Sequence, residues 1–152
     1  MKVNISERVE RARQYFLEGY NCAQAVFLTY QDFTPLDHTT VATIAAPFGG
    51  GMGRLREVCG TVSGMAFVAG AIAQSTDPSN LEQRKDNYAL VQRFANAFRS
   101  ENGDIVCRRL LGLEPMVERA ETAMPSERTA EYYRKRPCAE YVGCAARIVA
   151  EY

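Results

Sequence analysis

The sequence predicts an all-α protein with a single domain over residues 1–152. A length of 152 residues suits one domain, because the usual range is roughly 100–200 residues per domain. Apolar residues recur at helical spacing along nearly the whole chain, and no stretch alternates apolar with polar residues for long enough to predict a sheet. We therefore expect a bundle of about six or seven helices around a central helix without charge.

Helix caps and breakers place the predicted helices along the chain. The segments expected to be helical, short ones included, are residues 6–19, 22–32, 37–46, 57–74, 78–99, 105–111, 126–136 and 137–151. Ser6 and Asn21 can cap the first two, because their side chains accept hydrogen bonds from free backbone N–H groups. Asp104 is a similar cap for the short segment that ends at Gly112, and the last two segments divide before Pro137.

The central helix is predicted from a segment without charge, which runs from Val58 to Thr76. This segment is nearly long enough to cross a membrane. It contains no leucine, however, and it holds several glycines, serines and threonines, so we expect a buried helix rather than a membrane span. The next helix is more polar, and its buried face is expected to hold Leu81, Tyr88, Val91, Ala95 and Phe98.

Composition and charge exclude several classes of protein. Hydrophobic residues make up 47% of the chain and charged residues 24%, which is ordinary for a globular protein and argues against disorder. Because 18 Lys and Arg balance 18 Asp and Glu, no net field attracts nucleic acid, and we expect no nucleic-acid partner. The polar N-terminus lacks the apolar region of a secretory signal, so we expect a cytoplasmic protein whose thiols are kept reduced.

Most of the cysteines fall in the first turn of a predicted helix. The four at such positions are Cys22, Cys59, Cys107 and Cys138. Free backbone N–H groups and the positive end of the helix dipole stabilise an anion there, which is one way to lower the pKa of a thiol from about 8.5. Cys144 differs, because it lies in the middle of a helix and one straight helix cannot bridge it to Cys138. We interpret Cys144 as structural.

Cys22 and Cys59 are the preferred redox pair on this pattern. Both begin helices, and the glycine-rich loop before Cys59 lets backbone segments approach closely. The helix dipole and nearby arginines lead us to expect a lowered pKa for Cys22 or Cys59. Cys107 and Cys138 would then form a second pair or a relay. Four cysteines allow three pairings, and the sequence does not choose among them.

A glycine-rich loop, residues 48–54, precedes the central helix. The candidate binding residues around it are Gly49, Gly50, Gly51, Gly53, Arg54 and Gly60. Their backbone N–H groups could hold an anion with help from the arginine, although the simpler interpretation is a tight turn into the helix. The loop lacks the GK[ST] ending of a nucleotide-binding loop. The GxxxG spacing of Gly60 and Gly64 is typical of close helix packing.

These motifs resemble a redox-active protein family named for its Cys…CGAxxG…Cys…Cys pattern. The resemblance runs from about residue 7 to residue 150 and begins with the stretch Gly19-Tyr20-Asn21-Cys22-Ala23-Gln24-Ala25-Val26. It continues through the glycine loop, the block Cys59-Gly60-Thr61-Val62-Ser63-Gly64, Cys107 and Cys138. Thr61 stands where the family motif has alanine. The resemblance implies four cysteines that act together in redox chemistry, and it names no substrate.

Three functions stay open at this point. The first is thiol–disulfide or electron-transfer chemistry, as in a thiol-dependent oxidoreductase, with an unidentified redox partner or small molecule and no required cofactor. The second is a metal or Fe–S site held by the same four cysteines, which the lack of any local CxxC pair disfavours. The third is a module without catalysis that binds a small molecule or anion and uses its cysteines structurally.

Overall fold

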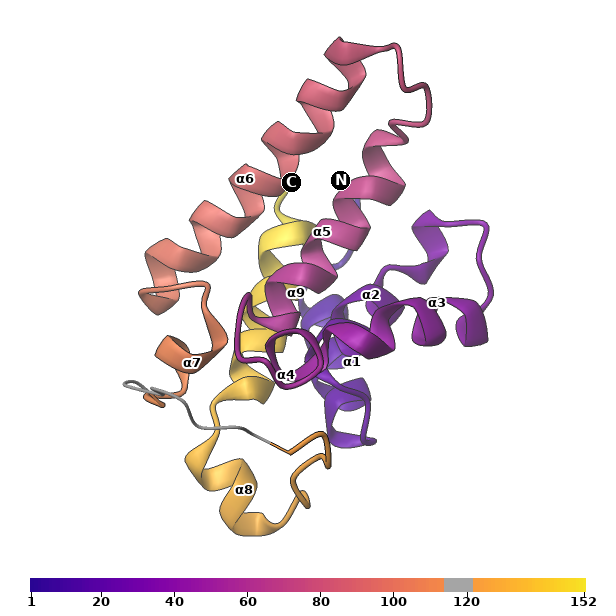
Figure 1. The fold of residues 1–152 in the computed structure, drawn as a ribbon. Helices are drawn as coiled ribbons and strands as arrows, with labels where there is room; N and C mark the ends of the chain where they lie inside the picture. Colours follow the sequence, from indigo (N-terminus) through magenta and orange to yellow (C-terminus); the bar gives the residue numbers. More distant parts are fainter. Residues whose placement is uncertain (114–121) are drawn as a thin grey trace.

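The computed structural model describes residues 1–113 and 122–152, and most of these residues lie in helices (Figure 1). The longer helices in this part are α1 (Ile5–Leu17), α2 (Cys22–Thr29), α3 (His38–Ala45), α5 (Gly60–Ala73), α6 (Leu81–Asn102) and α9 (Cys138–Ala150). The shorter ones are α4 (Gly49–Met52), α7 (Cys107–Leu110), α8 (Ala130–Lys135), η1 (Gln31–Phe33) and η2 (Ala46–Phe48). The described residues contain no strand beyond an isolated bridge between Val58 and Val106, so the predicted all-α class is confirmed.

Side-chain caps set where the first two helices begin. The Asn21 side chain accepts a hydrogen bond from the Gln24 backbone N–H, and the Gln24 side chain accepts one from the Asn21 N–H. This reciprocal cap makes Cys22 the first residue of α2, as predicted. The prediction for α1 was wrong, because Asn4 rather than Ser6 caps that helix by accepting from the Glu7 N–H.

Helix α5 lies at the centre of the bundle, which confirms the expected position of the helix without charge (Figure 1). It packs against α2, α6 and α9, and it shares the interior with α2 and α9. It begins at Gly60, three residues later than predicted, because residues 57–59 pair with residues 105–107 through backbone hydrogen bonds. Among the residues that the structure describes, no helix combines the length and the apolar character needed to cross a membrane.

The predicted buried face of α6 is confirmed only toward its C-terminal end, where Phe98 is buried and Val91 and Ala95 pack against the core. Leu81 is 68% exposed and Tyr88 59% exposed. The buried residues of this helix begin at Leu90 and continue with Phe94 and Phe98. The prediction was wrong for the first half because helical periodicity identifies an apolar face but does not show where a long helix leaves the bundle.

Helices α2 and α5 approach each other closely at two glycines of α5. A Cβ atom on Gly64 would lie 2.7 Å from Cβ of Val26 and 3.0 Å from the carbonyl oxygen of Ala23. One on Gly60 would lie 2.8 Å from the carbonyl oxygen of Phe48 and 3.4 Å from Cβ of Cys22. These approaches leave no room for a side chain. The GxxxG spacing is therefore a packing feature that brings the first turns of the two helices together.

We predict that Gly64→Ala lowers the free energy of unfolding by about 1–3 kcal/mol, because the added methyl group overpacks the contact with α2. The matched control is Gly70→Ala in the same helix, where an added Cβ meets nothing within 4 Å. That variant should gain roughly 0.5–1 kcal/mol, the usual advantage of alanine over glycine inside a helix. Urea denaturation measures both changes. Equal effects of the two substitutions would contradict the close crossing.

Candidate functional site

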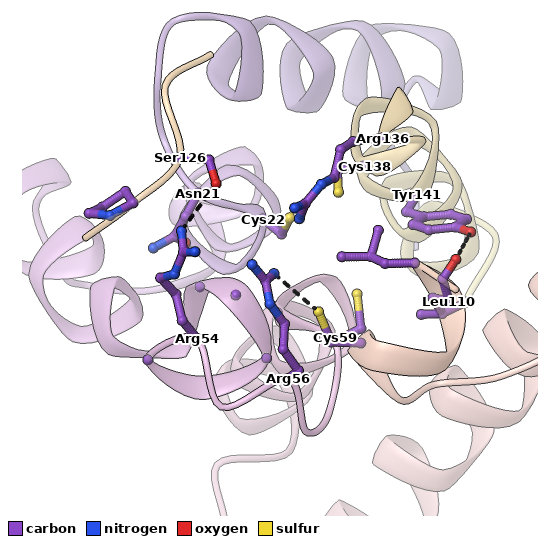
Figure 2. Close-up of a pocket in the computed structure, with 18 of the residues that line it drawn as sticks. Asn21, Cys22, Arg54, Arg56, Cys59, Leu110, Ser126, Arg136, Cys138 and Tyr141 are labelled. Atoms are coloured by element: carbon purple, nitrogen blue, oxygen red, sulfur yellow. Dashed lines mark hydrogen bonds between the residues drawn. The ribbon is translucent and has the colours of Figure 1, made fainter. Parts of the chain in front are cut away.

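The four cysteines at helix starts line one pocket, with a cavity of about 350 Å³ (Figure 2). Three of them are the first residue of their helix, namely Cys22 of α2, Cys107 of α7 and Cys138 of α9, while Cys59 is the N-cap of α5. The same pocket is lined by every candidate binding residue from the sequence, which are Gly49, Gly50, Gly51, Gly53, Arg54 and Gly60. The structure thus brings distant parts of the chain to a single place.

Cys22 and Cys138 lie close together within this pocket, and each shifts the pKa of the other (Figure 2). The Cys22 thiol lowers the pKa of Cys138 to about 7, with further help from the positive charges of Arg136, Arg56 and Arg128 against the cost of burial. The same contact, together with burial, raises the pKa of Cys22. Cys138 is thus the thiol of the pair that ionises first.

Cys59 and Cys107 lie on two neighbouring extended segments. The backbone N–H of Cys59 donates to the carbonyl oxygen of Ile105 at 2.8 Å, and the N–H of Cys107 donates to that of Glu57 at 2.6 Å. Burial raises the pKa of Cys59 to about 11, although the neighbouring Thr61 partly opposes this rise. Both thiols are therefore neutral near pH 7, since burial raises the pKa of Cys107 as well.

The pKa shifts bear on two expectations about Cys22 and Cys59. Cys138 has a larger effect than Cys59 on the pKa of Cys22, which favours Cys138 as its partner, while the preferred pairing of Cys22 with Cys59 stays a prediction. The expected lowered pKa of Cys22 or Cys59 is wrong for both residues, because each is raised. The start of a helix lowers the pKa of a thiol, but at Cys22 and Cys59 this effect is smaller than the rise that burial causes.

The glycine loop turns through the left-handed region of backbone conformation. Gly50 and Gly51 have φ values of +65° and +68°, and Arg54 and Arg56 share this region with φ values of +67° and +60°. A Cβ on Gly51 would lie 2.7 Å from Cβ of Cys107, so only glycine fits there. The loop ends by directing Arg56 inward, where its side chain is buried and Nη1 lies 3.7 Å from Sγ of Cys107.

Arginines supply the charge of the pocket. The described part of its lining holds Arg54, Arg56, Arg128 and Arg136 and contains no aspartate or glutamate. Figure 2 shows the guanidinium groups of Arg56 and Arg136 pointing toward the cysteine side chains. Positive charges at this position favour a thiolate and attract anions.

Arg128 is a lining residue that sequence analysis missed. Its guanidinium donates hydrogen bonds to the carbonyl oxygens of Phe16 and Tyr20 and lies 4.2 Å from the centre of the Phe16 ring. These contacts join parts of the chain more than 100 positions apart. No local sequence pattern predicts that Arg128 lines the pocket, because its position depends on contacts between the segment before α8 and the end of α1.

The four cysteines of the pocket are the residues that would hold a metal ion or Fe–S cluster. A structural zinc or Fe–S site needs four such ligands around one point. Among residues 1–113 and 122–152, however, no group of three or more His, Cys, Asp or Glu side chains is arranged to hold a metal ion.

Cys144 lies outside the pocket, on the side of α9 that faces α6. Its Sγ lies 3.4 Å from a carboxylate oxygen of Glu101 and 3.5 Å from Nδ2 of Asn102. Burial raises its pKa, and the nearby carboxylate adds to that rise. These contacts agree with a packing role, and they make Cys144 a useful internal control for thiol chemistry.

We predict that Cys138 reacts with iodoacetamide well before Cys59 or Cys144 at pH 7. Because its pKa is lowered to about 7, half of Cys138 is thiolate near that pH, and its rate should level off above it. The rate at Cys59, whose pKa is about 11, should still be rising at pH 9. Mass spectrometry of peptides alkylated at several pH values measures each rate. A Cys138 rate that tracks those of Cys59 and Cys144 would contradict the assignment.

A family model matches residues 20–152 of the chain, and its description is "Putative redox-active protein (C_GCAxxG_C_C)". The printed pattern has glycine before the second cysteine, whereas in this chain Gly60 follows Cys59. No curated protein and no solved structure matches the chain significantly. The match takes in all four cysteines of the pocket and most of the chain. The chain therefore belongs to the C_GCAxxG_C_C family of redox-active proteins.

Proposed function

We propose that this protein carries out thiol–disulfide exchange, with Cys138 as the nucleophile and Cys22 as the resolving thiol. The observation that carries the proposal is the closeness of these two thiols, each of which shifts the pKa of the other, in a pocket lined by arginines. Exchange needs a thiolate that the substrate can reach and a second thiol within reach of the first. Cys22 and Cys138 both line the pocket, which supports these two roles, and family membership supports redox chemistry in general.

The reaction follows from the charge of each thiol. The Cys138 thiolate attacks one sulfur of a disulfide, so that a mixed disulfide forms and the other sulfur leaves as a thiolate. Cys22 then gives up its proton, which passes to the departing thiolate, and attacks Sγ of Cys138. This second step forms a Cys22–Cys138 disulfide and releases the second half of the substrate as a thiolate that is protonated from water. The substrate gains two electrons, and the protein loses them.

Cys59 and Cys107 are proposed as a second pair or a relay in the same pocket. Their backbone pairing holds them on adjacent segments, and their high pKa values keep them protonated while Cys138 reacts. Arg56 lies beside Cys107 and also acts on Cys138, which connects the two pairs electrostatically. A disulfide at Cys22 and Cys138 would then exchange with this second pair.

The two other functions remain distinct outcomes of one experiment. A four-cysteine metal or Fe–S protein would contain stoichiometric metal and show visible charge-transfer absorption after anaerobic purification. A binding module with structural cysteines would contain no metal and would keep its thiols after mild oxidation. A thiol–disulfide protein without metal would lose two hydrogen atoms on oxidation.

We predict that limited oxidation joins Cys22 to Cys138 and that single substitutions separate their roles. Cys22→Ser should trap a mixed disulfide on Cys138, because no resolving thiol remains to release it. Cys138→Ser should slow the first step by at least about tenfold, because the remaining thiols are mainly protonated.

Mass spectrometry of non-reduced peptides identifies the bond in each variant. Cys144→Ser is the matched control, since it removes a thiol outside the pocket and should leave the Cys22–Cys138 bond unchanged. The assignment fails if the mixed disulfide of the Cys22→Ser variant forms at another cysteine, or if oxidation leaves all thiols of the unaltered protein free.

A further inference from the structure

We propose that the disulfide accepted by this pocket is a small anionic one, a low-molecular-weight disulfide that bears carboxylate groups. This inference rests on the proposed thiol–disulfide function and adds the class of substrate. It is carried by the side chains that surround the cysteines. Among them are Arg128 and Arg136, whose positive charges line the pocket together with Cys138.

Two of the arginines come from the segment that leads into Cys138. Arg136 stands two residues before Cys138, and its guanidinium lies 5.4 Å from the centre of the Tyr132 ring. This contact holds the guanidinium beside the pocket. Arg128, which donates to two backbone carbonyl oxygens, is fixed at the opposite end of this segment. Both lie in the lining, so their charges act on whatever enters.

The size and walls of the cavity suit a small molecule. Its volume of about 350 Å³ falls at the lower end of the range for ligand pockets, roughly 300–1,000 Å³. Apolar and aromatic side chains form part of the wall, and these include Leu110, Leu111 and Tyr141. A compact disulfide can place its sulfur atoms against this wall while its carboxylates face the guanidinium groups.

The charge of the substrate can be separated from the activation of the thiolate. Arginines raise the rate with every disulfide, because they increase the fraction of Cys138 that is thiolate. Two disulfides of opposite charge, however, react with the same Cys138 thiolate in the same protein. The ratio of their rates therefore reports attraction or repulsion by the pocket and does not depend on the pKa of Cys138.

With such a substrate, RS–SR, the reaction balances as follows. The bond between the two substrate sulfurs breaks and one forms between Cys138 and RS, which releases the first RS⁻. The bond between Cys22 and Cys138 then forms as the second RS⁻ leaves. Two protein thiols are oxidised, one disulfide is reduced to two RSH, and the protons of Cys22 and Cys138 end on the released thiols or in the solvent.

The experiment compares three disulfides that differ in charge. The dianion of 3,3′-dithiodipropionic acid is anionic, bis(2-hydroxyethyl) disulfide is neutral and cystamine is cationic, and all three are small enough to be compared by charge. Each rate of oxidation of the reduced protein is divided by the rate of the same disulfide with free dithiothreitol, which corrects for intrinsic reactivity. We expect the corrected rates to fall in the order anionic, neutral, cationic. The ratio of anionic to cationic rates should be roughly tenfold or more at low salt, because oriented charge in a cleft raises encounter rates by this order.

Arg136→Gln tests the source of the preference. It should lower the ratio of anionic to cationic rates by roughly threefold to tenfold, and Arg136→Lys should retain most of the ratio because the charge remains. Arg134→Gln is the matched control, since it removes the same charge from an exposed position outside the lining. Raising the salt concentration to about 0.15 M should shrink the ratio in the unaltered protein, because the screening length falls to about 8 Å. This measurement needs no variant.

The outcomes distinguish the two proposals. If none of the three disulfides removes two hydrogen atoms from the protein, thiol–disulfide exchange itself fails. If all three oxidise it at equal corrected rates, or the cationic one is fastest, exchange stands and the anionic substrate is wrong. A ratio that changes equally in Arg136→Gln and Arg134→Gln would also overturn the inference, because the preference would then come from net charge rather than from the pocket.

Discussion

Close backbone contact between the first turns of α2 and α5 determines where the sulfurs lie. Gly60 and Gly64 permit this contact, so the first turn of α5 packs against Cys22. Helix α9 packs on both α2 and α5 and brings Cys138 to the same point from the other end of the chain. Side chains at the two glycines would move α5 away from α2. The crossing is thus a structural requirement for any chemistry that uses the thiols together.

The balance between burial and positive charge decides which thiol ionises. All four cysteines of the pocket begin a helix or cap one, so their helix starts do not distinguish them. Cys59 is buried with only the neighbouring Thr61 to oppose the effect of burial, and its pKa rises to about 11. Cys138 is also buried, but it lies beside the Cys22 thiol and near several guanidinium groups. The Cys22 thiol and these arginines, rather than the helix dipole, separate the pKa values of Cys59 and Cys138.

Local features of this fold were predictable from the sequence, and contacts between distant segments were not. Asn21 identified the start of α2 because a helix cap depends on residues three positions apart. The closeness of Cys22 to Cys138 depends on how α9 packs, which no spacing along the chain reveals. The same limit explains why Arg128 was missed and why Leu81 was expected to be buried. The family resemblance grouped the four cysteines correctly but gave no partner for any of them.

The charge that activates Cys138 also bears on the stability of the proposed disulfide. The backbone of Arg56 has a left-handed conformation, which costs free energy in residues other than glycine. Its side chain is buried in the pocket. Its charge, like that of Arg136, stabilises the thiolate of the reduced protein and has no anion to stabilise once Cys22 and Cys138 are joined. Stabilising the reduced form makes a disulfide more oxidising. Under the proposed function, a bond between Cys22 and Cys138 is therefore readily reduced. This suits a protein that is oxidised and reduced repeatedly, and it does not suit a permanent structural disulfide.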